Sequence, residues 1–204
     1  MKTIAVILAA SDGAKLGIPE ANLEYEKGRS FLKWLSSTFS KAGATTIGVI
    51  SPGAEDVKER HPDTVLVEGE PGEGLIRAGL RAALDEGADL IILHPVDKPA
   101  VRSSTIDKLL KSVDGADGVV PDFEGAPGTP VVLKREAAER LLQMNGDLTK
   151  LQAIAERLNL RHINTKDPGV LVNIDTPEMY ERLLGKKPQP APLPKKRGKK
   201  PAEA

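Results

Sequence analysis

Acidic and amide side chains that could hold a divalent cation occur at two places in the second half of the sequence. Asp97 lies in the run HPVDKP, directly after the apolar residues 90–93, and Asn173 and Asp175 lie two residues apart in the run NIDTPE. Such oxygens suit Mg²⁺, which takes one or two carboxylates together with the phosphate oxygens of a nucleotide. These residues predict an Mg²⁺ site. A proline-rich turn at Asp97 and a helix start at Asp175 are alternative, purely structural explanations.

A loop of small residues follows the first apolar run and could contact phosphate groups. Residues 8–20 read LAASDGAKLGIPE, in which two glycines and a lysine could let backbone N–H groups approach an anion. The loop matches neither the dinucleotide pattern GxGxxG nor the P-loop pattern GxxxxGKS/T, so NAD-binding and P-loop ATPase functions lose their main support. Taken alone, the loop is explained by a tight surface turn. The run Gly128-Thr129-Pro130 could likewise face a substrate or be only a turn.

Short apolar runs and helical stripes must position these loops. Residues 3–8, 46–50, 64–67, 90–93 and 118–120 are nearly continuous in apolar side chains, as strands buried on both faces of a parallel sheet require. Three apolar stripes at helical spacing lie between them: Leu32, Leu35 and Phe39; Ile76, Leu80 and Ala83; and Ile106, Leu109, Leu110 and Val113. The alternation predicts a doubly wound, three-layer α/β fold, in which ligands bind at the carboxyl ends of the strands.

The second half of the chain continues this pattern. Residues 130–133 read as a strand, residues 136–144 and 148–158 as helices, and residues 170–174 as a further strand that carries Asn173 and Asp175 near one face. Thr176 is expected to cap a last helix, with Pro177 in its first turn.

Composition excludes several classes of protein. The 204 residues are 40% apolar and contain no cysteine, so one soluble domain is expected without disulfides, thiolate zinc sites or iron–sulfur clusters. The apolar run at residues 3–10 is too short to span a bilayer, so the protein is expected to be cytoplasmic, without a membrane partner. His61 and His162 lack neighbours at metal-ligand spacing and are expected to be surface residues.

Charge divides the chain into two parts. Residues 1–185 carry a net charge of −6 and residues 186–204 a net charge of +6, and the latter hold five of the sixteen prolines. The predicted organisation is therefore one domain over residues 1–185 and a disordered basic tail over residues 186–204. The tail is either a solubilising extension or an arm that binds nucleic acid or another acidic partner. Only six aromatic residues occur in the chain, which disfavours a base-stacking surface.

The motifs in this order resemble the MobA-like NTP transferases of molybdenum cofactor biosynthesis, nearest the molybdopterin cytidylyltransferase branch. The resemblance covers residues 1–185. The family's opening LAAGxSxRMGxPK is similar to residues 8–20, its LADQP to residues 94–99, its GHPV to residues 128–131, its GD to residues 146–147, and its DPGVLLDIDTPEDY to residues 167–180 without a gap. The resemblance implies a Rossmann-like, three-layer α/β/α fold of the nucleotide-diphospho-sugar-transferase type with a mostly parallel sheet.

The resemblance also implies an activity. A Mg²⁺-dependent nucleotidyltransferase would move a nucleoside monophosphate from a nucleoside triphosphate, CTP or GTP favoured, to a phosphate-bearing small molecule such as molybdopterin, and release pyrophosphate. Asp97 would then be the main metal ligand, Asn173 or Asp175 the second, and Lys15 and Asp97 the catalytic pair. The implied nucleotide-binding residues are Leu8, Ala9, Ala10, Ser11, Gly13, Lys15 and Gly17, and the implied substrate-binding residues are Gly128, Thr129 and Pro130.

The first loop departs from the family pattern where charge matters. Ser11 replaces a glycine, Lys15 replaces an arginine, and Glu20 replaces a lysine, which reverses a charge beside an expected polyanion. Two alternatives therefore stay open. One is a non-catalytic family member with a binding or regulatory role. The other is a GT-A-like glycosyltransferase, a class that usually presents two aspartates where this sequence has only Asp97.

Overall fold

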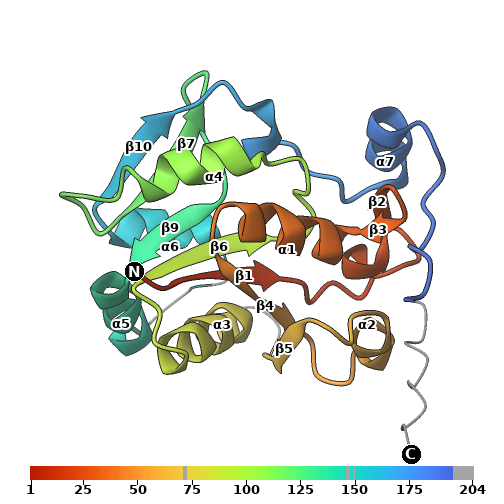
Figure 1. Ribbon diagram of the computed structural model, residues 1–204, viewed down its shortest axis with the longest axis horizontal. Coiled ribbons are helices and arrows are strands. Elements are labelled where there is room, and N and C mark those ends of the chain that lie inside the picture. Colours follow the sequence, from red (N-terminus) through yellow and green to blue (C-terminus); the bar gives the residue numbers. More distant parts are fainter. Residues whose placement is uncertain (71–72, 146–147, 149, 195–204) are drawn as a thin grey trace, which may run out of the picture.

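A mixed sheet lies at the centre of the fold, between two layers of helices (Figure 1). The computed structural model describes residues 1–70, 73–145, 148 and 150–194. The sheet order is β10-β7-β9-β6-β1-β4-β5, with β8 paired to β7, and a separate hairpin joins β2 to β3. The strands are β1 (Thr3–Leu8), β2 (Glu24–Glu26), β3 (Arg29–Ser30), β4 (Thr45–Ile50), β5 (Val65–Glu68), β6 (Leu90–Pro95), β7 (Gly118–Phe123), β8 (Ala126–Pro127), β9 (Val131–Lys134) and β10 (Leu160–Asn164).

Most neighbouring strands run parallel. β1 pairs in parallel with β4 on one side and β6 on the other, while β9 runs antiparallel to both β6 and β7. The carboxyl ends of β1, β4 and β6 therefore meet at one edge of the sheet. This arrangement confirms the predicted three-layer α/β fold with a mostly parallel sheet.

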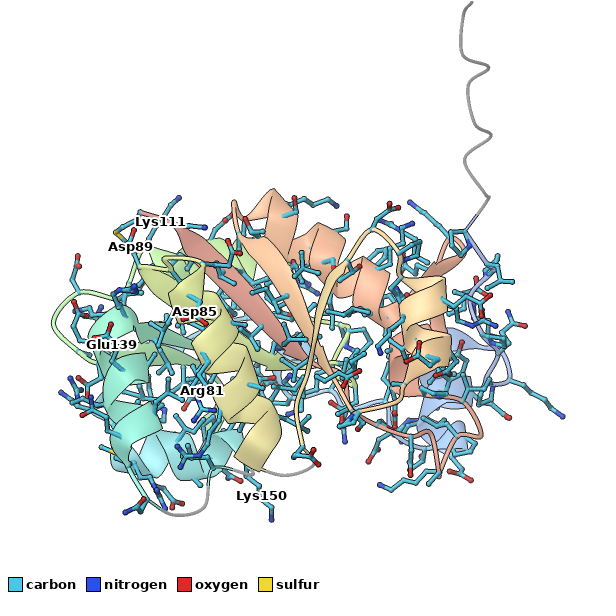
Figure 2. All side chains as sticks on the ribbon, turned by 90° about the horizontal axis from the view of Figure 1, so that it is seen from below. Arg81, Asp85, Asp89, Lys111, Glu139 and Lys150 are labelled. Carbon is cyan, nitrogen blue, oxygen red and sulfur yellow. The ribbon has the colours of Figure 1, made fainter. Side chains whose placement is uncertain are left out.

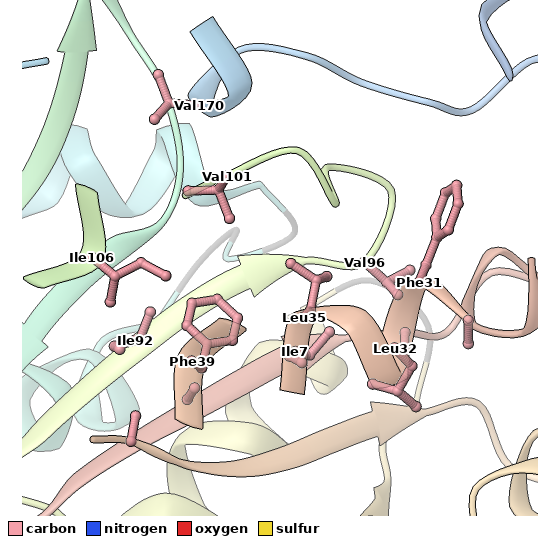
Figure 3. Packing of buried hydrophobic residues seen from close by; sticks show 14 of the residues in the cluster. Ile7, Phe31, Leu32, Leu35, Phe39, Ile92, Val96, Val101, Ile106 and Val170 are labelled. Atoms are coloured by element: carbon pink, nitrogen blue, oxygen red, sulfur yellow. The ribbon is translucent and has the colours of Figure 1, made fainter. Parts of the chain in front are cut away.

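The helices cover both faces of the sheet. They are α1 (Phe31–Lys41), α2 (Glu55–Arg60), α3 (Glu73–Asp85), α4 (Ser103–Leu110), α5 (Arg135–Gln143), α6 (Leu151–Arg157) and α7 (Pro177–Leu184), with short 3₁₀ turns η1 (Glu20–Asn22) and η2 (Pro168–Val170). One core cluster joins the sheet to α1, α4 and α7, and a second joins it to α3, α5 and α6. Figure 3 shows Leu35 and Phe39 of α1 lying over Ile7 and Ile92 of the sheet.

The predicted helical stripes face the core. Leu32, Leu35, Phe39, Leu80 and Ala83 are fully buried. The solvent-facing sides of the helices on one face of the sheet carry charged side chains, as Figure 2 shows for Arg81 and Asp85 of α3 and for Glu139 of α5. Each of these helices is thus held to the sheet by burial of one apolar face.

Two details of the second half differ from the sequence prediction. Residues 170–174 do not form a strand. Val170 ends the 3₁₀ turn η2, whose start is capped by the Asp167 side chain accepting a hydrogen bond from Gly169 N at 3.0 Å, and residues 171–174 are irregular. The sheet instead gains β10, an edge strand that pairs in parallel with β7. The other predicted strands are confirmed to within a few residues, as are the predicted helices at α5 and α6.

The segment that follows α7 is ordered along residues 186–194. Ala191 is buried and its N–H donates to Asn22 O at 2.8 Å, while Lys186 Nζ pairs with Glu24 Oε2 at 3.1 Å. Backbone hydrogen bonds and this ion pair hold the segment, although its single large apolar side chain, Leu193, is exposed. These contacts of residues 186–194 differ from the expected disorder, whereas residues 195–204 lie outside the described part of the chain, so the extent of the tail stays a prediction.

Within the described ranges, no helix is long and apolar enough to span a membrane.

Candidate active site

Three loops meet at the carboxyl edge of the sheet. The loop after β1 is tied to the loop after β6 by a hydrogen bond from Val96 N to Leu8 O at 3.0 Å. It is tied to the loop after β4 by a hydrogen bond from Ser51 Oγ to Ala10 O at 3.0 Å. The residues that the sequence predicts for nucleotide and metal binding thus lie on adjoining loops.

The loop after β1 depends on Gly13. Its φ angle is +75°, and a Cβ atom there would lie 2.2 Å from the carbonyl carbon of Ile18, so only glycine fits. The Gly13 carbonyl accepts from Leu16 N and Gly17 N at 3.0 and 2.7 Å. The two predicted glycines therefore shape a compact turn.

Side chains within this turn occupy two of its backbone donors. Ser11 Oγ accepts from Gly13 N at 3.1 Å, and Asp12 Oδ1 accepts from Ala14 N at 2.9 Å. A phosphate that used these N–H groups would first have to displace both side chains. The bond to Ser11 Oγ depends on the serine, because the family that the sequence resembles has a glycine at this position, which has no side chain to accept the bond.

Lys15 reaches across the edge to the loop before α7. Its Nζ lies 2.9 Å from Asp175 Oδ2, and this hydrogen-bonded pair raises the pKa of the lysine. The Lys15 side chain is 65% exposed and the Asp175 side chain 28% exposed. The cation is therefore accessible to a ligand at the same edge.

Among the carboxyl groups at this edge of the sheet, Asp97 has the most strongly shifted pKa. Burial raises its pKa to about 6, Lys98 opposes the rise, and Glu20 and Asp175 add to it. Its Oδ1 atom is buried without a hydrogen-bond partner. A cation at this oxygen would stabilise the ionised form.

Asn173 and Asp175 are brought to Asp97 by the backbone between them. Ile174 N donates to Asp97 O at 2.7 Å, although the segment is not the strand that the sequence predicts. Asn173 Oδ1 is also buried without a partner. The predicted cap of α7 is confirmed, since Thr176 Oγ1 accepts from Met179 N at 3.3 Å.

These oxygens fit a hard divalent cation. Asp97 Oδ1 and Asn173 Oδ1 are partnerless oxygen atoms on adjoining segments, and Mg²⁺ needs only one or two carboxylates from a protein. Across the described residues, no three His, Asp or Glu side chains are grouped so as to share one ion. Such an ion would therefore take most of its ligands from water and from a bound nucleotide.

The turn at Gly128, Thr129 and Pro130 lies deeper than a surface loop. All three residues are buried, and Thr129 N donates to Val170 O at 3.0 Å. A Cβ atom on Gly128 would lie 2.6 Å from the same carbonyl oxygen. Thr129 Oγ1 is buried without a partner and is the polar atom of this turn that a ligand could use.

A cavity of about 330 Å³ opens beside the first loop. It lies between the loops after β1 and β4 and reaches α2. Its lining residues are Ala9, Ala10, Ser11, Asp12, Pro19, Ser51, Pro52, Gly53, Ala54, Asp56 and Val57. Its size and its mixed polar and apolar lining are adequate for part of a nucleoside.

Sequence reasoning did not show that two acidic residues of this edge are buried. Glu20 is only 6% exposed, and it raises the pKa of Asp97 although burial is the larger cause. Asp167 is also buried and accepts from Thr105 Oγ1 at 2.7 Å and from Arg102 N at 2.9 Å. No pattern in the sequence indicates that the Glu20 side chain points inward. Asp167, by contrast, stands before a proline, where a capping role is common.

Two buried histidines brace the loops around the site. His94 Nε2 lies 2.9 Å from Lys98 O, and His61 Nε2 lies 3.1 Å from Asn22 Oδ1. Burial lowers the pKa of each from 6.5 to about 4. The prediction that His61 is a surface residue is wrong, because the loop before β5 packs it against η1.

We expect stability to fall in mild acid because both histidines are buried uncharged. The unfolded chain takes up protons below pH 6.5, but the folded chain does so only near pH 4, so unfolding becomes easier between these values. The loss is up to ~3 kcal/mol for each histidine. Urea unfolding of His61→Gln across this range should show a shallower dependence than the wild type, and the exposed His162→Gln should match the wild type. Equal slopes for His61→Gln and the wild type would contradict the expectation.

Comparisons with known proteins place the chain in a family. The family described as the MobA-like NTP transferase domain matches residues 5–184. The bifunctional protein GlmU of Azorhizobium caulinodans is 35% identical over 136 residues, which are 62% of this chain and 30% of that protein. The 2-C-methyl-D-erythritol 4-phosphate cytidylyltransferase of Streptomyces avermitilis is 28% identical over 178 residues, which are 80% of this chain and 68% of that protein. The chain thus spans less than a third of GlmU.

A solved structure agrees with these sequence matches. The crystal structure of Rv0371c from Mycobacterium tuberculosis superposes with a TM-score of 0.74 at 25% identity and covers 91% of this chain and 98% of that one. The family match extends from β1 to α7 and includes each loop of the carboxyl edge. The chain belongs to the MobA-like NTP transferase family, whose members transfer nucleotidyl groups.

Proposed function

We propose that this protein is a Mg²⁺-dependent nucleotidyltransferase. It would transfer a nucleoside monophosphate from CTP or GTP to a phosphate group of a small molecule and release pyrophosphate. Molybdopterin is the acceptor that the family resemblance implies, and 2-C-methyl-D-erythritol 4-phosphate is the acceptor in the name of one relative.

One observation carries this proposal. Asp97 Oδ1 and Asn173 Oδ1 are both buried without partners on segments joined by the hydrogen bond from Ile174 N to Asp97 O. Buried polar atoms in proteins are nearly always satisfied, so two partnerless oxygens at one edge indicate a ligand that is charged or polar. Lys15 lies at the same edge, where a triphosphate needs a cation.

The chain's own residues would position the reaction rather than form covalent bonds. The cavity between the loops after β1 and β4 would hold the nucleoside, and Lys15 would leave Asp175 to contact the triphosphate. An oxygen of the acceptor phosphate would then attack the α-phosphorus, and the bond from the α-phosphorus to the bridging oxygen would break as pyrophosphate leaves. Alignment and charge neutralisation supply most of the rate in such transfers.

Mg²⁺ would be held by Asp97 with Asn173 or Asp175. When bound, it neutralises charge on the phosphate oxygens and on the leaving pyrophosphate.

A second candidate function is a non-catalytic binding domain of the same family. Ser11 and Asp12 occupy the N–H groups of Gly13 and Ala14, and the carboxylate of Glu20 is buried near Asp97. Both features oppose binding of a triphosphate. They favour a domain that has kept the fold but binds another partner.

Titration of the full-length chain with CTP, GTP, ATP and UTP in the presence of Mg²⁺ distinguishes the two. We expect micromolar affinity for one nucleotide in calorimetry, and pyrophosphate release when a phosphate-bearing acceptor is added. Lys15→Met should lower the affinity for that nucleotide about tenfold, because a charge-assisted hydrogen bond is worth roughly 1.5–3 kcal/mol. The exposed Lys41→Met on α1 is the matched control and should bind as the wild type does. Absence of binding for all four nucleotides would favour the non-catalytic domain.

A further inference from the structure

Partnerless buried atoms gather around one edge of the fold. In the described part of the chain, five buried side-chain atoms have no hydrogen-bond partner, and they belong to Glu20, His94, Asp97, Thr129 and Asn173. These residues lie in η1, in and after β6, before β9 and before α7, and the segments carrying Asp97 and Asn173 are bonded to one another. Glu20 has no explanation within the site described so far.

Glu20 is held firmly in its buried position. It opens the turn η1, whose next residues Ala21 and Asn22 are 1% exposed and whose end is fixed by Leu23 N donating to Glu20 O at 3.1 Å. The side chain itself is 6% exposed, and its Oε2 atom has no partner. A buried carboxylate oxygen without a partner is strongly unfavourable unless a cation compensates it.

The charged neighbours of Glu20 show where such a cation belongs. Asp97 lies within electrostatic reach of Glu20. Lys15 also lies within electrostatic reach, but its Nζ is hydrogen-bonded to Asp175. Asp175 therefore has its cation, whereas Glu20 and Asp97 each retain a partnerless oxygen atom.

We propose that Glu20 is a ligand of a divalent cation that it shares with Asp97 and Asn173. Together the three partnerless oxygens would supply two carboxylate ligands and one amide ligand, a combination that suits Mg²⁺ or Mn²⁺. Water completes the coordination when no substrate is bound. This set contains only two carboxylates, in keeping with the lack of any three-membered group of His, Asp and Glu among the described residues.

This role of Glu20 in catalysis rests on the proposed function, to which it adds a third metal ligand. A cation at Glu20 would present positive charge to the triphosphate at the place where Glu20 alone would repel it. The charge of Glu20 would then assist nucleotide binding through the metal rather than oppose it.

Titration with Mn²⁺ alone tests the proposal, because free Mn²⁺ is measured by electron paramagnetic resonance without any nucleotide. The full-length wild type should bind Mn²⁺, and Glu20→Gln should bind it at least tenfold more weakly. Glu26→Gln removes an exposed carboxylate from the same region and should leave the affinity unchanged. Near-ultraviolet circular dichroism of each variant confirms that it is folded.

Glu20→Asp separates direct ligation from a general effect of charge. It keeps the charge but shortens the side chain by one methylene group, so a direct ligand should lose affinity whereas a distant charge should not. Equal Mn²⁺ affinity in the wild type and Glu20→Gln would overturn the proposal, and so would a wild type that binds no Mn²⁺. A protein that shows the Glu20 effect but releases no pyrophosphate would instead refute only the proposed function.

Discussion

Asp97→Asn should lower turnover about 10²–10³-fold and at the same time make the protein more stable. The amide keeps the shape of the side chain and leaves the backbone bond from Ile174 N to Asp97 O in place. It removes the negative charge that a divalent cation and the transferred phosphate require. Loss of one such electrostatic contact costs about 10²–10³-fold in turnover, which a pyrophosphate-release assay would measure.

The gain in stability follows from the raised pKa of Asp97. Because burial raises this pKa from 3.8 to about 6, ionisation at neutral pH weakens the folded state, and a neutral asparagine escapes that penalty. We expect the free energy of unfolding to rise by as much as ~3 kcal/mol near pH 7, with the gain lost below the unfolded pKa.

The control for Asp97→Asn is Asp85→Asn, on the exposed outer face of α3 (Figure 2). This variant should retain both activity and stability. Unchanged turnover in Asp97→Asn would remove Asp97 from the reaction. Lower stability in Asp97→Asn would mean that its carboxylate makes a favourable contact in the folded protein.

Much of the fold could be predicted because the central strands are buried on both faces. The runs TIAVIL and LIIL have the continuous apolar character of strands buried on both faces, and they form β1 and β6. The stripe of Leu32, Leu35 and Phe39 predicts the face of α1 that packs on the sheet. β10 escaped prediction because Arg161 and His162 are exposed at the sheet's edge and break the apolar run. Residues 170–174 have the apolar pattern of a strand, but the chain enters them from the 3₁₀ turn η2, which Asp167 caps, and they pair with no strand of the described sheet.

The candidate site was only partly predictable for a similar reason. Asp97 follows a buried strand, so its position at the carboxyl edge was expected from the sequence. The inward direction of Glu20 depends on the burial of Ala21 and Leu23 beside it, which no local pattern shows. The hydrogen bond from Gly13 N to Ser11 Oγ likewise depends on the shape of the loop.

Tyr180→Ala should be the most destabilising truncation at this end of the molecule. The Tyr180 side chain is fully buried, its ring stacks on Phe31 with centroids 6.1 Å apart, and its hydroxyl donates to Glu24 O. Replacing a large buried aromatic ring by a methyl group typically costs about 3–5 kcal/mol. For a chain of this size, the corresponding fall in Tm is about 10 °C, which calorimetry would detect.

Tyr180 also bears on the site, since α7 begins directly after Asp175. The segment that carries Asn173 and Asp175 is held at one end by the bond from Ile174 N to Asp97 O and at the other by the packing of α7. Tyr180→Phe keeps the ring and should lower the free energy of unfolding by only ~1 kcal/mol. Leu183 lies exposed on the same helix, so Leu183→Ala should destabilise the protein less than truncation of a buried leucine does. If packing of α7 positions these oxygens, Mn²⁺ affinity should fall in Tyr180→Ala and stay unchanged in both other variants. A folded Tyr180→Ala that binds Mn²⁺ as the wild type does would show that the bond to Asp97 alone holds the segment in place.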